Sequence, residues 1–210
     1  MAKYAEMTVK EYMTELAAGT PIPGGGGAAA MSGALGAALA SMTANMTIGR
    51  EKYAANEPEL KELLALMERA RVRLLDLVDE DAIAFNKLIT GFKMPKKTEA
   101  EIEARKKVIR SAAKESAEVP LNVSRLMVEI LGVAARLVVI GNPNVITDAA
   151  CSVLFARAAM RCAAYNVKIN LPLTKDPAYI KAAEDELRIL RRDAIRFEHQ
   201  AMDVVEKVLG

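Results

Sequence analysis

The sequence predicts an all-α fold: a single helical bundle with long antiparallel helices and an Ala/Gly-rich central helix. Three observations support this. Apolar residues recur at the 3.6-residue period of helices along most of the chain, no convincing strand pattern appears, and residues 21–53 contain a long run of small uncharged side chains. The 210 residues show no linker, so we expect one domain spanning residues 1–210.

Local signals predict the first two helices. Thr8 and Glu11 form a capping box that starts a short helix. Pro21–Pro23 then stop any helix, because proline lacks an N–H and restricts the residue before it. Four glycines, Gly24–Gly27, follow, and the small-residue helix is expected over Gly27–Ile48.

The third helix is expected to begin with Asn56 as its cap and Pro58 in its first turn. A loop is expected over Gly91–Lys97, and a second capping box, Thr98 with Glu101, starts the next helix. The third helix carries a sustained apolar stripe at helical spacing: Leu60, Leu64, Met67, Ala70, Leu74, Val78, Phe85 and Leu88.

Pro120 is expected to break or kink the fourth helix, because a proline inside a helix removes one hydrogen bond and clashes with the preceding turn. A new apolar pattern follows it. The cluster Gly141–Asn144 then predicts a turn.

After this turn, Thr147 or Asp148 is expected to start an alanine-rich helix that ends near Tyr165. Residues 166–175 are expected to form a mixed loop or a short extended piece. Asp176-Pro177 then opens a last long amphipathic helix.

Composition excludes several classes of protein. A formal net charge of +2 and 4% aromatic residues do not favour nucleic-acid binding. The N-terminus lacks a signal-peptide apolar region. Cys151 and Cys162 lie eleven positions apart in one helical pattern, about 16 Å, which excludes a disulfide and favours a cytoplasmic protein. His199 is the only histidine, and no zinc-ligand spacing occurs, so no metal site is expected.

The glycine loop admits three interpretations. Gly24, Gly26 and Ala29 match G-x-G-x-x-A, but no strand precedes them and no P-loop lysine follows. The uncharged stretch Gly24–Gly49 is long enough to span a membrane, yet alanine and glycine gain little from lipid. We therefore expect a central bundle helix, with the loop at its start as a candidate site for an anion or a polarised oxygen.

Asp81 is the most notable carboxylate, because it occupies an apolar position of the stripe formed by residues 74, 78, 85 and 88. Burial there would raise its pKa into a range useful for proton transfer. It could instead pair with an arginine or cap another helix. Asp79 lies near the flank of the same helix, and Asp148 is either a second site carboxylate or a plain helix cap.

Six segments, taken together and in order, resemble the formiminotransferase-cyclodeaminase C-terminal domain family. The resemblance covers nearly the whole chain, with conservative departures at Gly27 and Thr147. The segments are Pro21–Gly26; Ala44–Gly49 with Lys52-Tyr53; Val78–Ala82 with Phe85; Glu118–Leu121; Gly141–Asn144 with Thr147–Ala149; and Asn166–Leu171.

This resemblance implies a helical bundle that dimerises and binds folate near the glycine loop. The formiminotransferase half has no counterpart here, so the expected activity is methenyltetrahydrofolate cyclohydrolase, with formimidoyltetrahydrofolate cyclodeaminase as the alternative. A folate-binding or structural bundle without catalysis is a third possibility. Neither reaction changes redox state, so no cofactor is expected, and a buried carboxylate can carry the proton.

The expected site follows from the same segments. Asp81 is the candidate base, expected to share one cleft with Asp148, and Asp79 is a further catalytic candidate. Basic side chains of Lys52, Arg105 and the loop Lys93, Lys96 and Lys97 are expected to pair with the glutamate tail of a possibly polyglutamated substrate. The expected substrate-binding residues are Pro23, Gly24, Gly25, Gly26, Asn45, Lys52, Arg105, Asn142, Asn144 and Asn170.

Overall fold

Six α-helices make up most of the protein, whose computed structural model describes residues 3–210. Short 3-10 turns lie at Tyr4–Glu6, Glu51–Asn56 and Pro143–Val145, and no strand occurs within the described range. The all-α prediction is confirmed. The helices are α1 (Val9–Ala17), α2 (Gly25–Asn45), α3 (Glu57–Lys93), α4 (Glu99–Ile140), α5 (Ile146–Thr174) and α6 (Pro177–Leu209).

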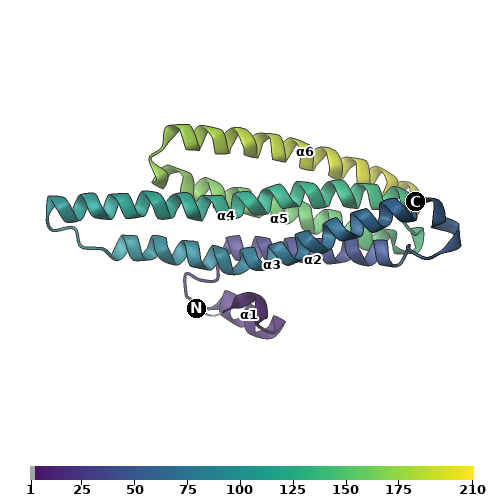
Figure 1. Cartoon of the computed structure of the whole chain (residues 1–210), viewed down its shortest axis with the longest axis horizontal. Coiled ribbons are helices and arrows are strands. Elements are labelled where there is room, and N and C mark those ends of the chain that lie inside the picture. The colour runs from purple at the N-terminus through teal and green to yellow at the C-terminus, as the bar shows by residue number, and fades with distance from the viewer. Residues whose placement is uncertain (1–2) are drawn as a thin grey trace.

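Helices α2 to α5 form a four-helix bundle in which each packs against the next, and α5 packs back against α2. Helix α6 covers α4 and α5 from outside this bundle. Figure 1 shows the five long helices lying along the long axis of the molecule, with the short α1 set to one side. The main core lies between α2, α3, α4 and α5, and it holds Leu74, Met127, Leu131 and Met160 among its fully buried side chains.

Helix α2 is built from small residues because its neighbours approach it closely. A Cβ atom at Gly33 would lie 2.4 Å from the Cε atom of Met127, and one at Gly36 would lie 3.2 Å from the carbonyl oxygen of Ser152. The helix is long and apolar enough to span a membrane by length and composition, yet 61% of that stretch is buried inside the bundle. It is the central helix predicted from its composition.

Both capping boxes are confirmed. The Thr8 backbone N–H donates to the Glu11 carboxylate over 2.8 Å, and the Glu11 N–H donates back to Thr8 Oγ1. Thr98 and Glu101 make the same exchange at the start of α4. Asn56 precedes α3 as predicted, but its side chain does not cap the helix. Instead its Nδ2 atom donates to the Ile140 carbonyl oxygen.

Two predictions about α2 and α4 were wrong. Helix α2 begins at Gly25, not Gly27, because a carboxylate from α3 satisfies its first turn, and it ends at Asn45. Pro120 lies inside one continuous helix, Glu99–Ile140, so the break that was one of its two expected effects does not occur. It removes one backbone donor. Packing of α4 against α3, α5 and α6 outweighs that loss.

The predictions for both ends of α5 were also wrong. The helix starts at Ile146, so Asp148 lies in its first turn and is not the cap. The helix runs through residues 166–174, because Val167 and Leu171 are buried against α4 and α6. The side-chain Nδ2 atom of Asn170 also donates to the backbone carbonyl oxygen of Asn166. The expected loop there does not exist. Cys151 and Cys162 form no disulfide, as predicted, and both are exposed.

Candidate functional site

A cleft of about 300 Å³ opens where the N-terminus of α2 meets α3, α4 and the second half of α5. Its walls are mostly apolar, with a few polar groups between them, which is the usual make-up of a small-molecule site. The lining residues are Pro21, Ile22, Gly24, Gly25, Gly26, Asp81, Phe85, Leu88, Phe92, Ser116, Asn166, Ile169, Asn170 and Leu173.

Asp81 from α3 and the glycines of α2 form the polar end of this cleft. The Gly27 N–H donates to Asp81 Oδ2 over 2.8 Å, so the carboxylate caps α2 across 54 positions of sequence. A Cβ atom at Gly26 would lie only 2.1 Å from Asp81 Oδ1. Glycine is required at position 26 because the carboxylate occupies the space of a side chain, and the backbone there is not in the left-handed region.

The surroundings of Asp81 act on its pKa in opposite directions. Burial raises the pKa of this carboxyl group, and the hydrogen bond from Gly27 partly offsets the rise. Tyr12 of α1 is buried close by. Burial first, then the charges of Asp81 and Asp79, raises the pKa of its phenol to about 12. The Asp81 carboxyl and the neighbouring Tyr12 phenol therefore both keep their protons to higher pH than such groups ordinarily do.

Further polar groups in the cleft come from α4 and α5. The Ser116 hydroxyl is 3% exposed and has no hydrogen-bond partner in the described structure, an uncommon state for a buried polar group. Asn166 lies against Gly25, and its Nδ2 atom donates to the Cys162 carbonyl oxygen over 2.9 Å. Asn170 donates to the carbonyl oxygens of Ser116 and Asn166. Ser116 is thus free to bind a polar ligand atom.

Several predicted site residues do meet in this cleft. Gly24, Gly25 and Gly26 line it together with Asp81 and Asn170. Pro23 is buried next to them in sequence but does not line the cleft. Arg105 does not line the cleft, but its Nη2 atom donates to the carbonyl oxygen of the lining residue Phe92 over 3.4 Å.

Asp79 does not belong to the cleft. Its Oδ1 atom accepts a 2.6 Å hydrogen bond from the Tyr4 backbone N–H, which ties the N-terminal segment to α3. The geometry gives this carboxylate a structural role beside Asp81.

The remaining predicted residues lie at the opposite end of α2. Asn142 there donates from Nδ2 to the Met46 carbonyl oxygen, and its backbone N–H donates to Thr47 Oγ1. Twenty residues of helix, about 30 Å, separate that end from Gly25. The prediction that Asp148 shares a cleft with Asp81 is therefore wrong for a single chain. The residues at this far end are Asn45, Lys52, Asn142, Asn144 and Asp148.

Sequence reasoning missed part of the site. Leu88 was assigned only to the apolar stripe, Phe85 to the stripe and to a segment that resembles a family, and Asn166 to another such segment. None of them was expected to line the site. Ser116 and Tyr12 carried no signal, because nothing in a sequence marks a buried hydroxyl as unpartnered. Within residues 3–210 no cluster of three His, Cys, Asp or Glu side chains could hold a metal ion.

The arrangement suits proton transfer and the binding of a positively charged centre. The Asp81 carboxylate lines the cleft while the Gly27 N–H holds its Oδ2 atom in place. A carboxylate whose pKa lies above its ordinary value can both accept and return a proton during the reaction. Flat apolar side chains, Phe85 and Phe92, are placed to cover an aromatic or heterocyclic ligand.

Comparison with known proteins gives one consistent result. Residues 8–189 match the family described as Formiminotransferase-cyclodeaminase. The chain is 38% identical over 199 residues to the Methenyltetrahydrofolate cyclohydrolase of Methylorubrum extorquens, covering 95% of this chain and 96% of that protein.

Longer relatives match as well. The Formimidoyltransferase-cyclodeaminase of Rattus norvegicus is 28% identical over 189 residues, which is 90% of this chain but only 35% of that protein. Among solved structures, the formiminotetrahydrofolate cyclodeaminase of Thermotoga maritima superposes with a TM-score of 0.89 at 29% identity, covering 98% of both chains.

Proposed function

This chain belongs to the formiminotransferase-cyclodeaminase family, and on that premise we propose that it is a methenyltetrahydrofolate cyclohydrolase. It would convert 5,10-methenyltetrahydrofolate and water to 10-formyltetrahydrofolate. The supporting observation is the relative of that name, which is 38% identical and matches end to end, whereas the curated cyclodeaminase relatives are 26–28% identical and extend far beyond this chain.

The second candidate is formimidoyltetrahydrofolate cyclodeaminase, which closes 5-formiminotetrahydrofolate to the methenyl compound and releases ammonia. The Thermotoga maritima structure supports it, because that protein also lacks any large extension relative to this chain. Both reactions pass through a tetrahedral carbon bound to N5, N10 and one further heteroatom. The same carboxylate can therefore serve either reaction.

Asp81 is the residue that we assign to proton transfer. Water adds to the cationic carbon between N5 and N10, and the ionised Asp81 carboxylate takes one of its protons. Asp81 then returns that proton to N5 as the C–N5 bond breaks. The hydroxyl proton leaves as the new C=O bond forms, so one proton is released overall and the formyl group stays on N10.

The remaining groups of the cleft fit this assignment. The ionised Asp81 stabilises the cationic carbon before water adds. The unpartnered Ser116 hydroxyl can bind a ring nitrogen or carbonyl of the pterin, and Phe85 and Phe92 can cover its rings. A cleft of about 300 Å³ suits the pterin end of the molecule and leaves the glutamate tail outside. No redox cofactor is needed, because neither reaction transfers electrons.

Two assays on one preparation test the function. Loss of the methenyl absorbance measures the cyclohydrolase, and ammonia release from 5-formiminotetrahydrofolate measures the cyclodeaminase. We expect kcat/KM to be higher for the first. A tenfold or greater excess of the second would overturn the cyclohydrolase assignment, and activity in neither assay would leave only a binding or structural role.

We further infer that the active form is a homodimer, and the two unpaired cysteines, Cys151 and Cys162, favour the cytoplasm as its location. Leu35 and Met42 on α2 and Leu154 and Phe155 on α5 are 40–52% exposed on two helices that pack against each other. None of them is charged, so a second copy of the same face is a suitable partner. Leu35→Glu combined with Leu154→Glu should convert a dimer to a monomer in light scattering. An unchanged mass would contradict this interface.

A further inference from the structure

Pro120 leaves one backbone carbonyl of α4 without its usual donor. In an α-helix each carbonyl oxygen accepts a hydrogen bond from the N–H four residues later, and proline has no N–H. The carbonyl oxygen of Ser116 therefore lacks its helical donor, although Ser116 and Pro120 are both buried inside one continuous helix. A buried carbonyl in this position needs a donor from another part of the protein.

Asn170 of α5 supplies that donor. Its Nδ2 atom donates to the carbonyl oxygen of Ser116 over 3.0 Å and to that of Asn166 over 2.9 Å. The amide nitrogen carries two hydrogens, so both are used. The side chain is 8% exposed, and turning the amide over would point its oxygen at two carbonyl oxygens. The orientation of the Asn170 amide is therefore fixed.

The oxygen of this amide is the part that is left for a ligand. Asn170 lines the cleft, and no described residue donates to its Oδ1 atom. Asn166 also lines the cleft, beside Gly25, and its Nδ2 atom donates to the Cys162 carbonyl oxygen over 2.9 Å. Two side-chain amides on α5, about 6 Å apart along the helix, therefore offer their oxygens as acceptors to the cleft.

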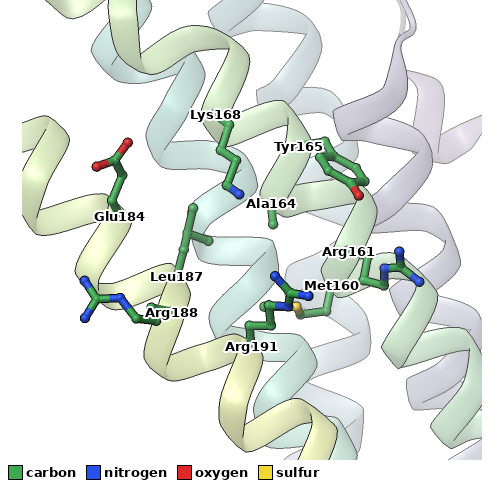
Figure 2. A pocket seen from close by; sticks show the side chains of 9 residues that line it. All are labelled: Met160, Arg161, Ala164, Tyr165, Lys168, Glu184, Leu187, Arg188 and Arg191. Atoms are coloured by element: carbon green, nitrogen blue, oxygen red, sulfur yellow. The ribbon is translucent and has the colours of Figure 1, made fainter.

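The charged groups of this half of α5 and α6 lie elsewhere. Another hollow, of about 360 Å³, lies between these two helices (Figure 2). The basic side chains that border it are Arg161, Lys168, Arg188 and Arg191. None of them lines the cleft, where Asp81 is the only ionisable residue among the described lining residues. The polar groups on the α5 wall of the cleft are thus neutral amides, which suit neutral N–H donors better than an anion.

We propose that Asn170, held by the carbonyl that Pro120 leaves free, recognises the N–H edge of the 2-amino-4-oxopyrimidine ring of the pterin. This inference rests on the proposed function. The ring carries an exocyclic amino group next to a ring N–H, so it presents adjacent donors that an amide oxygen can accept. A heterocycle without these donors would leave the Asn170 oxygen unpaired and would bind more weakly.

The two residues have different parts in this recognition. Asn170 contacts the ligand and determines specificity. Pro120 does not line the cleft, so it acts only through Asn170 and is a positioning residue. The hydrogen bond from Asn170 to Ser116 also joins two segments that resemble the same family, the one that contains Pro120 and the one that contains Asn170.

The first test measures binding without catalysis. Isothermal titration compares 5-formyltetrahydrofolate with its analogue in which a methyl group replaces the 2-amino group. Wild type should bind the analogue about threefold to tenfold more weakly, the scale of one hydrogen bond. Asn170→Ala should bind the two ligands with affinities within about twofold of each other, because the acceptor is gone. An equal preference for the amino group in both proteins would overturn the role of Asn170.

The second test uses the two prolines that lie inside helices. Pro120→Ala restores an N–H that competes with Asn170 for the Ser116 carbonyl, so the protein should melt at the same or a higher temperature than wild type. Its KM for methenyltetrahydrofolate should nevertheless rise by about threefold to tenfold, because the Asn170 amide loses its anchor. Its kcat should stay within about twofold of wild type, since Pro120 touches no reacting group.

Pro172→Ala is the matched control. Pro172 lies inside α5, is exposed and does not line the cleft, so this variant should keep the KM of wild type. A KM that rises equally in both proline variants would show a general effect on the helices and would overturn the positioning role of Pro120. An unchanged KM in Pro120→Ala would overturn it as well.

The outcomes separate this inference from the function on which it rests. If the titrations show a preference for the amino group that depends on Asn170, but no folate is turned over, the proposed function falls and the recognition by Asn170 stands. If methenyltetrahydrofolate is hydrolysed, but wild type binds both titrated ligands equally, the function stands and this inference falls.

Discussion

The carboxylate of Asp81 on α3 accepts a hydrogen bond from the backbone N–H of Gly27 on α2, at 2.8 Å and across 54 positions of sequence. One carboxylate oxygen is thereby held by the start of a helix, whose partial positive charge favours an anion. The same side chain also lines the cleft. The Asp81 side chain therefore has two roles: it caps helix α2, and it is the candidate base. Mutation can separate these two roles.

Asp81→Asn should abolish most activity without unfolding the protein. The amide oxygen of asparagine can still accept from Gly27, but asparagine cannot take a proton, and the loss should be at least about 100-fold in kcat. Asp76→Asn is the control, since Asp76 is an exposed carboxylate on the same helix. Steady-state kinetics with a thermal melt of each variant would decide. Full activity in a folded Asp81→Asn protein would exclude Asp81 as the base.

The pH dependence should follow the raised pKa of Asp81. Because burial raises the pKa of this carboxyl, kcat/KM should increase with pH through an apparent pKa above the ordinary value of 3.8. The folded protein holds the Asp81 proton more tightly than the unfolded chain does, so protonation of Asp81 stabilises the fold. This stabilisation of the fold is fully present below pH 3.8 and is lost as the pH rises through the pKa that Asp81 has in the folded protein. Asp81→Asn should therefore melt at the same or a higher temperature than wild type at neutral pH. A clearly lower melting temperature would contradict this sign.

Gly26→Ala should damage both the cap and the site. The added Cβ would lie 2.1 Å from Asp81 Oδ1, so the carboxylate must move and the bond to Gly27 is lost. We expect a destabilisation of about 1–3 kcal/mol, the scale of overpacking, although alanine is the better helix former. Gly19→Ala is the control, because nothing lies within 4 Å of a Cβ there. Chemical unfolding of both variants tests the contrast, and equal stabilities would refute it.

Ser116 and Ser124 offer a matched pair on α4. The Ser116 hydroxyl is buried without a partner, whereas the Ser124 hydroxyl donates to the Pro120 carbonyl oxygen over 3.0 Å. Both changes to alanine gain the same helix propensity, so Ser116→Ala should be more stable than Ser124→Ala by about 1 kcal/mol. Only Ser116→Ala should also weaken substrate binding, by about threefold to tenfold. Unchanged KM in Ser116→Ala would remove this hydroxyl from the site.

Much of the fold was predictable because its signals are local. The capping boxes at Thr8 and Thr98 and the apolar stripe of α3 depend on residues three or four positions apart. The errors at Pro120 and at residues 166–174 have the opposite origin. There, packing against neighbouring helices sustains a helix that local propensity argues against, and no local pattern reports that packing.

The site was predicted in part for the same reason. Asp81 could be identified, because a carboxylate on an apolar stripe is visible in one helix. The residues that lie beside Asp81 could not be identified in the same way. Asp148 and Asn142 belong to segments that resemble the same family, but the order of segments along the chain does not say at which end of the bundle each one lies. The bond of Asp81 to Gly27 and the unpartnered Ser116 depend on distances between helices.

The requirement for glycine at position 26 constrains how such a protein could diversify. The wall beside Asp81 is formed by the main chain of Gly26, which carries no side chain and cannot accept one. Mutation therefore cannot change the shape of this wall by replacing one side chain with another. Changes of specificity would have to arise at lining positions that carry side chains, such as Phe85, Phe92 and Ile169. Adaptation to new ligands is thereby directed to these side chains, while the main-chain wall beside Asp81 stays constant.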